Sequence, residues 1–207
     1  MLRQQIGIWY NGGMSSIKNI VILGATGSIG QQTLDVVRQH QDELNVIGLV
    51  ANSSKEKINA DAKEFNVKQT LLMSQEKTQD EANKKLVQMI TAPDVDIVVN
   101  AIGGAAGLIA SYFSLTANKR LALANKESLV VGGDILMPIA NNLKTATGEY
   151  KLLPIDSEHG AIFQCLIGET HSEIYKLHIT ASGGPFFGKK TADLHNVTCS
   201  QALTHPT

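Results

Sequence analysis

From Ile17 onward, short apolar runs alternate with longer amphipathic stretches, and this alternation limits the possible folds more than any other feature of the chain. Runs of about four to six apolar residues are typical of buried strands, whereas apolar residues at every third or fourth position are typical of one helix face. Strands that alternate with helices form a parallel sheet, because each parallel connection needs a crossover. The sequence therefore predicts a doubly wound parallel α/β fold. The expected strands are residues 19–23, 45–50, 70–73, 95–100, 121–124 and 150–155, and the expected helices are residues 28–40, 54–65, 79–90, 103–117 and 128–142.

The pattern changes near residue 151. A helix at residues 158–166, a strand at residues 176–181, a glycine loop and a short helix with a capping box of Thr198 and Gln201 indicate the beginning of an α+β domain. Residues 1–16 lack the apolar segment of a signal peptide, and Met14 stands just before the first apolar run, so we interpret them as an extension or a mis-assigned start. The expected domains are residues 17–150 and residues 151–207, the second being incomplete.

Composition excludes several classes of function. The formal net charge of −1 and the pI of about 6.6 provide no global field for nucleic acid or anionic lipid. No apolar run reaches the length of about 18 residues that a membrane helix needs. The two cysteines, Cys165 and Cys199, are too few for a disulfide framework and too far apart for a zinc-binding pair, which favours a reducing cytoplasm. We therefore expect a small-molecule ligand, with no nucleic-acid or membrane partner.

A glycine-rich turn, GATGSIG at residues 24–30, joins the first expected strand to the first expected helix. Here Gly24 permits a tight turn, Gly27 lets the backbone approach a pyrophosphate, and Gly30 lets the helix pack close to the strand. The N–H groups at the start of the helix would face the anion. The alternative is a purely structural turn, but the strand–turn–helix context favours a dinucleotide-binding, Rossmann-like domain.

Asn52, Ser53, Ser54 and Lys55 follow the second expected strand. Many NAD-binding proteins place an acidic residue here, which accepts a hydrogen bond from the ribose 2′-hydroxyl and repels a 2′-phosphate. Neutral donors and a lysine tolerate the phosphate instead, so the turn favours NADP(H) over NAD(H).

Asp156 and Glu158 stand two residues apart after the last expected strand. In extended backbone both carboxylates point to the same side, where they need a cation, and hard oxygen ligands suit Mg²⁺ or Mn²⁺. An equally good alternative is that Asp156 caps the following helix and Glu158 lies in its first turn.

Three further motifs have both a functional and a structural interpretation. Lys126, between Asn125 and Glu127 at the end of a strand, could meet a phosphate or enolate oxygen, or Asn125 could simply cap the next helix. Ser182, in a glycine-rich loop, could bind an anion or only form a turn. His205 could be a ligand or an ordinary surface histidine.

Five motifs occur in the order GATGSIG, LANKESLV, DSEHGAIFQ, TASGGPF and ALTHP, and from residue 17 to residue 207 the chain resembles the 1-deoxy-D-xylulose 5-phosphate reductoisomerase family. The resemblance implies a cytoplasmic, homodimeric enzyme that uses NADPH and Mn²⁺ or Mg²⁺ to convert this ketose phosphate to 2-C-methyl-D-erythritol 4-phosphate, an isoprenoid precursor. It implies contacts with NADPH by Thr26, Gly27, Ser28, Ile29, Asn52, Ser53, Ser54, Asn125 and Glu127, contacts with the phosphorylated substrate by Lys126, Ser157, Ser182 and His205, and metal binding by Asp156 and Glu158. Lys126 and Glu158 are the expected catalytic groups. Asn52 departs from the family, which often has a glycine at that position.

The family continues beyond the position of His205 with a flap, a substrate-binding Asn-Lys pair, a third metal-binding Glu and a helical C-terminal domain. We therefore expect a chain that ends at Thr207 to bind NADPH without turnover. Two other functions stay open, namely a different NADP-dependent dehydrogenase that needs no metal, and a nucleotide-binding remnant without turnover.

Overall fold

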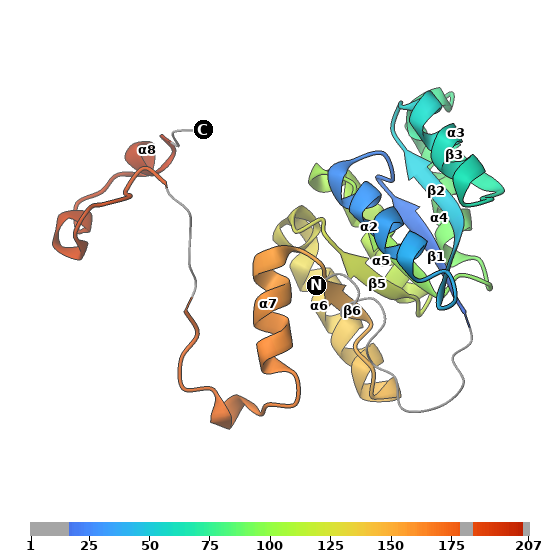
Figure 1. Ribbon diagram of the computed structural model, residues 1–207. Coiled ribbons are helices and arrows are strands. Elements are labelled where there is room, and N and C mark those ends of the chain that lie inside the picture. Colours follow the sequence, from blue (N-terminus) through green and yellow to red (C-terminus); the bar gives the residue numbers. More distant parts are fainter. Residues whose placement is uncertain (1–16, 179–183, 205–207) are drawn as a thin grey trace. The chain divides into compact units, whose positions relative to one another are not determined.

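Six parallel strands form one sheet, which confirms the fold predicted from the alternating pattern. The computed structural model describes residues 17–178 and 184–204. The strands lie in the order β3-β2-β1-β4-β5-β6 (Figure 1). Both β2 and β4 pair with β1, so a ligand crevice is expected at the carboxyl ends of β1 and β4, where the strand order reverses. The bounds are β1 Lys18–Leu23, β2 Leu44–Ala51, β3 Gln69–Leu72, β4 Ile97–Asn100, β5 Arg120–Leu123 and β6 Leu152–Pro154.

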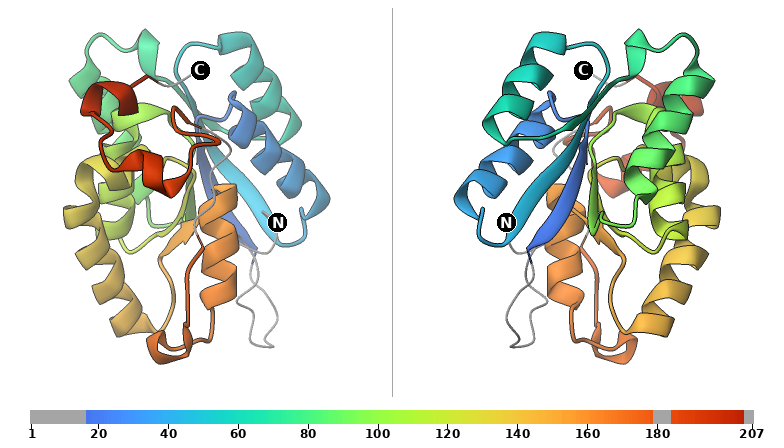
Figure 2. Two further views of the ribbon diagram at one scale, coloured as in Figure 1. Left: turned by 90° about the vertical axis from the view of Figure 1, so that its left-hand side faces the viewer. Right: turned by 90° about the vertical axis from the view of Figure 1, so that its right-hand side faces the viewer.

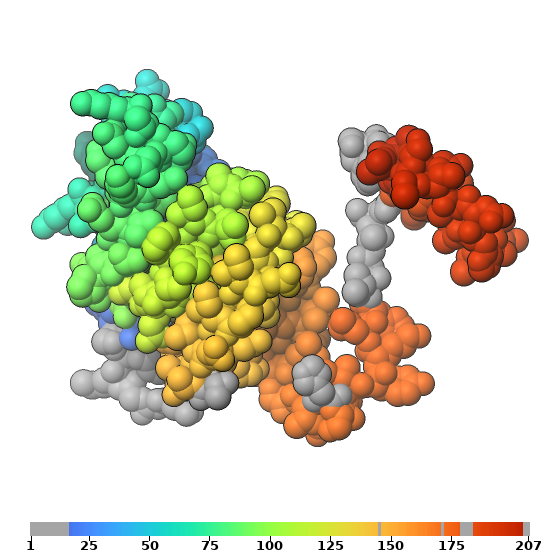
Figure 3. All heavy atoms as spheres, turned by 180° about the vertical axis from the view of Figure 1, so that it is seen from behind, coloured from blue at the N-terminus to red at the C-terminus, as the bar shows by residue number. Residues whose placement is uncertain are grey.

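Helices cover both faces of the sheet, because successive residues of a strand point to opposite sides. In β1, Ile20 and Ile22 pack into one core, Val21 and Leu23 pack into the other, and all four are fully buried. The first face is covered by α2 (Ser28–Gln39) and α3 (Lys55–Glu64), and the second by α4 (Gln79–Thr91), α5 (Leu108–Thr116) and α6 (Glu127–Thr147) (Figure 2). Over the second face, α4, α5 and α6 lie side by side (Figure 3).

Two elements differ locally from the predicted ones. The helix predicted at residues 103–117 begins as a 3-10 turn, η2 (Gly104–Gly107), and continues as α5, because Gly104 has a left-handed φ of +69° that an α-helix does not contain. Helix α6 kinks at Gly132, whose φ of −131° and ψ of 21° are not helical.

Among the described residues, no helix is both long enough and apolar enough to cross a membrane.

The chain divides into two compact units, Met1–Cys165 and Leu166–Thr207. The first includes β6 and nearly all of α7 (Ser157–Leu166), since β6 pairs with β5 in the sheet. Compactness alone does not define a functional domain, so the boundary near residue 151 stays a prediction.

The second unit contains only short elements, η3 (His171–Glu173), η4 (Thr191–Leu194) and α8 (Cys199–Ala202), and none of its described residues is buried. The capping box of Thr198 and Gln201 is confirmed. The strand predicted at residues 176–181 is wrong for residues 176–178, which form no strand, and its remainder lies outside the described residues. An isolated strand is unstable without a partner, and the described part of this unit provides none.

Candidate functional site

The glycine turn lies at the carboxyl end of β1 and is fixed by its neighbours on both sides. The N–H groups of Gly24 and Ala25 both donate to the Val50 carbonyl oxygen at 2.9 Å. Gly24 has a φ of +74°, and a Cβ there would lie 2.5 Å from the carbonyl oxygen of Ala101, just after β4. A Cβ on Gly30 would lie 2.4 Å from the Gly24 carbonyl oxygen. Only glycine fits these two positions, so the turn, the start of α2 and the loop after β4 pack in direct backbone contact.

The amino end of α2 is open. Its N-cap residue, Gly27, provides no side-chain cap, and the first turn of α2 contains no acidic residue. Gly27 and Ser28 are exposed, and Thr26 and Ile29 are partly buried. Uncapped N–H groups at the positive end of a helix form an anion-binding site. The four residues predicted to contact the cofactor therefore surround donors that suit a pyrophosphate.

Asn52, Ser53 and Ser54 form an exposed turn at the end of β2. Ser74 holds the backbone of this turn by donating to the Asn52 carbonyl oxygen from its N–H at 3.0 Å and from its hydroxyl at 2.8 Å. Ser54 is the N-cap of α3, but its hydroxyl makes no capping bond. The turn thus combines a fixed backbone with available polar side chains and has no carboxylate, as a 2′-phosphate requires.

Lys57, in the first turn of α3, is a site residue that the sequence did not reveal. Its Nζ donates to the Thr26 carbonyl oxygen at 2.9 Å and places a positive charge beside the glycine turn. Lys57 is exposed, so it combines a solvated position with this bond to the glycine turn. Lys57 could have been identified from the sequence, because it lies at the amino end of α3 directly after the Asn52–Ser54 turn.

The LANKES and DSEH motifs meet at the carboxyl ends of β5 and β6. Lys126 Nζ lies 2.9 Å from Asp156 Oδ2, although 30 residues separate the two. His159 was also missed from the sequence, and its Nδ1 lies 2.7 Å from Asp156 Oδ1. The signal was its spacing, because a residue three positions after Asp156 at a helix start lies within reach of that carboxylate.

Asp156 and Lys126 form an ionised pair. Burial alone would raise the pKa of Asp156, but hydrogen bonds from Lys126 and His159 outweigh burial and lower it to about 2. The hydrogen bond with Asp156 raises the pKa of Lys126, and the charges of Glu158 and Glu127 add smaller effects in the same direction. Lys126 therefore stays protonated.

Asp156 and Glu158 offer the carboxylate oxygens that suit a hard divalent cation. Ser157 donates from its hydroxyl to Glu158 Oε2 at 3.0 Å, and the described residues bring no third ligand to the pair. Both oxygens of Asp156 are engaged, so a cation has to displace Lys126 or share Asp156 with it. Asp156 Oδ1 also accepts from the His159 N–H at 3.4 Å, and Glu158 lies in the first turn of α7, so the capping alternative is confirmed together with the ion pair. Ser157 and Glu158 are helical, so the extended backbone expected to point both carboxylates to the same side is wrong.

Asn125 is 3% exposed, and its side chain points into the protein. Its Nδ2 donates to the Ile102 carbonyl oxygen at 2.5 Å, to the Gly104 carbonyl oxygen at 2.8 Å and to Glu127 Oε2 at 3.2 Å. Its Oδ1 accepts from the Ser128 N–H at 3.1 Å, as expected of a helix cap. Direct contacts of Asn125 and Glu127 with NADPH stay predictions. Ser182 and His205 lie outside the described residues, so their roles also stay predictions.

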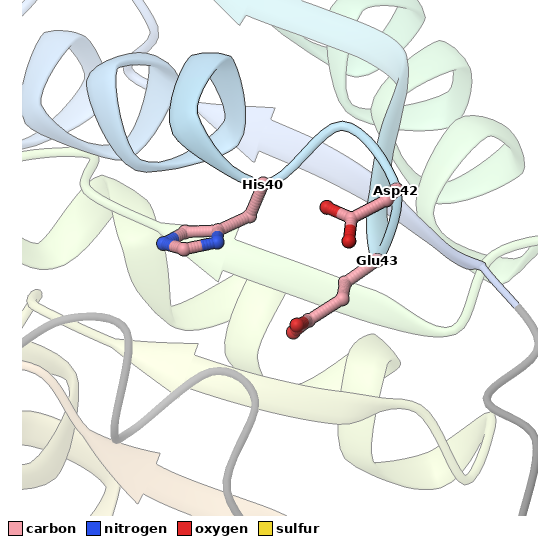
Figure 4. A group of neighbouring side chains, drawn as sticks. All are labelled: His40, Asp42 and Glu43. Carbon is pink, nitrogen blue, oxygen red and sulfur yellow. The ribbon is translucent and has the colours of Figure 1, made fainter.

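A second cluster of possible metal ligands lies elsewhere. His40, Asp42 and Glu43 bring their ligand atoms within 4.8 Å of one another in the turn between α2 and β2 (Figure 4). Backbone hydrogen bonds from Glu43 and Leu44 to the His40 carbonyl oxygen fix this turn. It precedes β2, whereas the glycine turn follows β1, so the cluster is at the opposite edge of the parallel sheet from the candidate site.

The strand order, the glycine turn and the open amino end of α2 define an α/β protein with a fold of the Rossmann type. A family model described as 1-deoxy-D-xylulose 5-phosphate reductoisomerase matches residues 20–133, and a model of the C-terminal domain of this enzyme matches residues 152–207. The chain belongs to the 1-deoxy-D-xylulose 5-phosphate reductoisomerase family.

Curated relatives and solved structures agree with this assignment. The chain is 43% identical over 205 residues to 1-deoxy-D-xylulose 5-phosphate reductoisomerase of Clostridium tetani, and 41% identical over 201 residues to that of Thermoanaerobacter sp.. Each match covers 92% of this chain but 52% and 51% of the relatives, so the chain spans about half the length of the curated relatives it matches.

Two solved structures give the same result. A crystal structure of DOX-P reductoisomerase in complex with NADPH, fosmidomycin and magnesium matches with a TM-score of 0.68 and 36% identity, covering 92% of this chain and 51% of that one. The enzyme from Zymomonas mobilis in complex with NADPH matches with a TM-score of 0.71 and 35% identity, covering 88% of this chain and 50% of that one.

Proposed function

We propose that this chain forms the NADPH-binding part and the beginning of the catalytic part of a 1-deoxy-D-xylulose 5-phosphate reductoisomerase, the two parts meeting near residue 151. The proposal rests on one observation: the glycine turn and the Lys126–Asp156 pair lie at the same carboxyl edge of one sheet. A dinucleotide whose pyrophosphate sits at β1 extends its other half toward β4, β5 and β6, where the lysine and the carboxylates stand. The reaction would rearrange the ketose phosphate to a branched aldehyde and reduce it to 2-C-methyl-D-erythritol 4-phosphate.

The cofactor proposed is NADPH. Thr26, Gly27, Ser28 and Ile29 bind its pyrophosphate through the open end of α2. Residues 52–54 bind the 2′-phosphate with uncharged donors, and Lys57 adds a nearby positive charge. Relatives solved with NADPH support this choice.

In the catalytic part, Asp156 and Glu158 would hold Mg²⁺ or Mn²⁺, which supplies Lewis acidity to the oxygens of the substrate. Lys126, kept protonated by Asp156, donates to a substrate oxygen on which negative charge develops. Ser157, Ser182 and His205 complete the proposed contacts with the phosphorylated ketose. A relative solved with magnesium and fosmidomycin supports a metal in this family.

The cofactor assignment is tested by titrating the chain with NADPH and NADH while monitoring nicotinamide fluorescence. We expect NADPH to bind at least about tenfold more tightly, and Ser53→Asp to reverse the preference, because a carboxylate repels the 2′-phosphate and accepts from the 2′-hydroxyl. Asn142→Asp adds the same charge near the end of α6 and should leave the preference unchanged. Equal affinity of the parent chain for the two cofactors would contradict the assignment.

An NADPH oxidation assay with 1-deoxy-D-xylulose 5-phosphate separates the possible activities. Metal-dependent oxidation of NADPH identifies the reductoisomerase, and metal-independent oxidation of NADPH with another aldehyde or ketone, which is reduced, identifies a different dehydrogenase. Binding of NADPH without oxidation is expected both of a reductoisomerase part that lacks the rest of the catalytic residues and of a nucleotide-binding module.

We further propose a cytoplasmic homodimer without nucleic-acid or membrane partners. The two free cysteines fit a reducing compartment, and light scattering of the purified protein tests the dimer.

A further inference from the structure

We propose that Asn100 is a positioning residue of the cofactor site. Its buried side chain holds residues 101–107, here named the β4 loop, in a conformation in which backbone N–H groups of this loop face the nicotinamide half of NADPH. Asn100 is the last residue of β4 and lies at a position for which the family resemblance gave no role. This inference rests on the proposed function.

The side chain of Asn100 joins the two ends of the β4 loop. It is fully buried, and its Oδ1 accepts from the Ile102 N–H at 3.2 Å, near the start of the loop. Its Nδ2 donates to the carbonyl oxygen of Gly107, the last residue of the loop, at 2.9 Å. The same Nδ2 lies 2.9 Å from Ser111 Oγ in α5. Buried polar groups are costly when unpaired, so these bonds fix the separation of the two loop ends.

Asn125 holds the same loop from the neighbouring strand end. Its Nδ2 donates to the carbonyl oxygens of Ile102 and Gly104, and a Cβ on Gly107 would lie 2.6 Å from its Oδ1, so only glycine leaves room for this side chain. The hydroxyls of Ser111 and Ser128, both buried, lie 3.4 Å apart and connect the two asparagine clusters. The β4 loop is therefore held by two amides from adjacent strands.

This arrangement determines the direction of the loop peptides. In a trans peptide the carbonyl and the following N–H point in opposite directions, and the described residues contain no cis peptide. Because the Ile102 and Gly104 carbonyls point toward the buried Asn125, the N–H groups of Gly103 and Ala105 point away from it. Residues 103–106 are exposed, and a Cβ on Gly103 or Gly104 would meet nothing within 4 Å. The loop therefore presents N–H donors to open space.

The location of these donors fits the nicotinamide half. The close contact of Gly24 with the Ala101 carbonyl oxygen makes the β4 loop the direct neighbour of the pyrophosphate-binding turn on the β4 side of the sheet. The adenosine half belongs to the β2 side, where residues 52–54 lie. The carboxamide oxygen of nicotinamide is a neutral acceptor that suits backbone N–H groups.

The test compares NADPH with adenosine 2′,5′-bisphosphate, which lacks the nicotinamide half, in the parent chain and in Asn100→Ala. We expect Asn100→Ala to weaken NADPH binding about tenfold and to change the affinity for adenosine 2′,5′-bisphosphate less than about twofold. The fluorescence enhancement of bound nicotinamide should also decrease. The matched control is Ser114→Ala. Ser114 is buried in α5, as Ser111 is, but among the described residues its hydroxyl bonds only the Ala110 carbonyl oxygen. It should change neither affinity.

If Asn100→Ala does not fold, Ser111→Ala decides, because it removes one partner of Asn100 and leaves the bonds to Ile102 and Gly107. It should weaken NADPH about threefold and leave adenosine 2′,5′-bisphosphate unaffected. An equal loss for both ligands, or no loss for either, in the variant that folds overturns the positioning role. Failure of the folded parent chain to bind either ligand refutes the proposed function itself, and the inference with it.

Discussion

Individual residues at the sheet edge determine how closely the parts of the site approach one another. A Cβ on Gly30 would meet the Gly24 and Ala25 carbonyl oxygens at 2.4 and 2.5 Å, and rigid backbone cannot move away cheaply. We expect Gly30→Ala to lower the free energy of unfolding by about 1–3 kcal/mol and to impair NADPH binding. Gly133→Ala is the control, because a Cβ there meets nothing within 4 Å and alanine should stabilise the helix by about 0.5–1 kcal/mol. Urea denaturation measures both, and similar stabilities would contradict this account of Gly30.

Asp156 and Lys126 should have opposite effects on metal binding. Asp156→Asn removes a carboxylate ligand, so Mn²⁺ should bind more weakly than to the parent chain. Lys126→Met removes the cation that occupies Asp156, so Mn²⁺ should bind severalfold more tightly in the absence of other ligands. Isothermal titration calorimetry measures both affinities. Identical Mn²⁺ binding by the parent and Asp156→Asn would show that the carboxylate pair is structural.

At the scale of elements, an ion pair connects α2 to α3. Arg38 Nε lies 2.6 Å from Glu64 Oε1, and this hydrogen bond holds the pKa of Glu64 below its ordinary value of 4.5. The stabilisation is therefore present above about pH 4.5 and is lost as the pH falls through the lower folded-state pKa. We expect Glu64→Gln to lower the urea midpoint slightly at pH 7, and the difference from the parent to shrink below about pH 4.5. A difference that stayed constant down to pH 3 would exclude this carboxylate as its source.

The sequence predicted the elements well where periodicity is strong and poorly where tertiary bonds dominate. All six strands of the sheet and the helices between them were predicted, because buried strands and amphipathic helices have distinct patterns. The start of the helix predicted at residue 103 was wrong, because Asn100 and Asn125 shape that segment from outside it.

In the candidate site, the glycine turn and the Asp156 motif could be recognised from local spacing. Lys57 and His159 were missed, since their roles depend on contacts with Thr26 and Asp156 that only the folded chain makes. The roles assigned to Ser182 and His205 came from the resemblance alone.

For the molecule as a whole, stability is concentrated in the first unit. The described residues of the second unit include none that is buried, and Tyr175, Phe187 and Leu203 are 100%, 82% and 83% exposed. We expect limited trypsin digestion to cleave after Lys176, Lys189 or Lys190 before any site in the first unit. Mass spectrometry of the products identifies the sites. Earlier cleavage within residues 18–165 would contradict this distribution of stability.

The central place of β1 also has a consequence for synthesis on the ribosome. β1 can pair with β2 soon after both emerge, but its other edge pairs with β4, and Asn19 and Asp96, which are joined by a hydrogen bond, are 77 residues apart. Until residue 100 has left the exit tunnel, Ile20 to Leu23 have an unpaired edge. Unpaired apolar edges invite association with other chains. The nascent chain therefore passes through a period in which the strand that leads into the glycine turn exposes one edge to other chains before its own sheet can cover it.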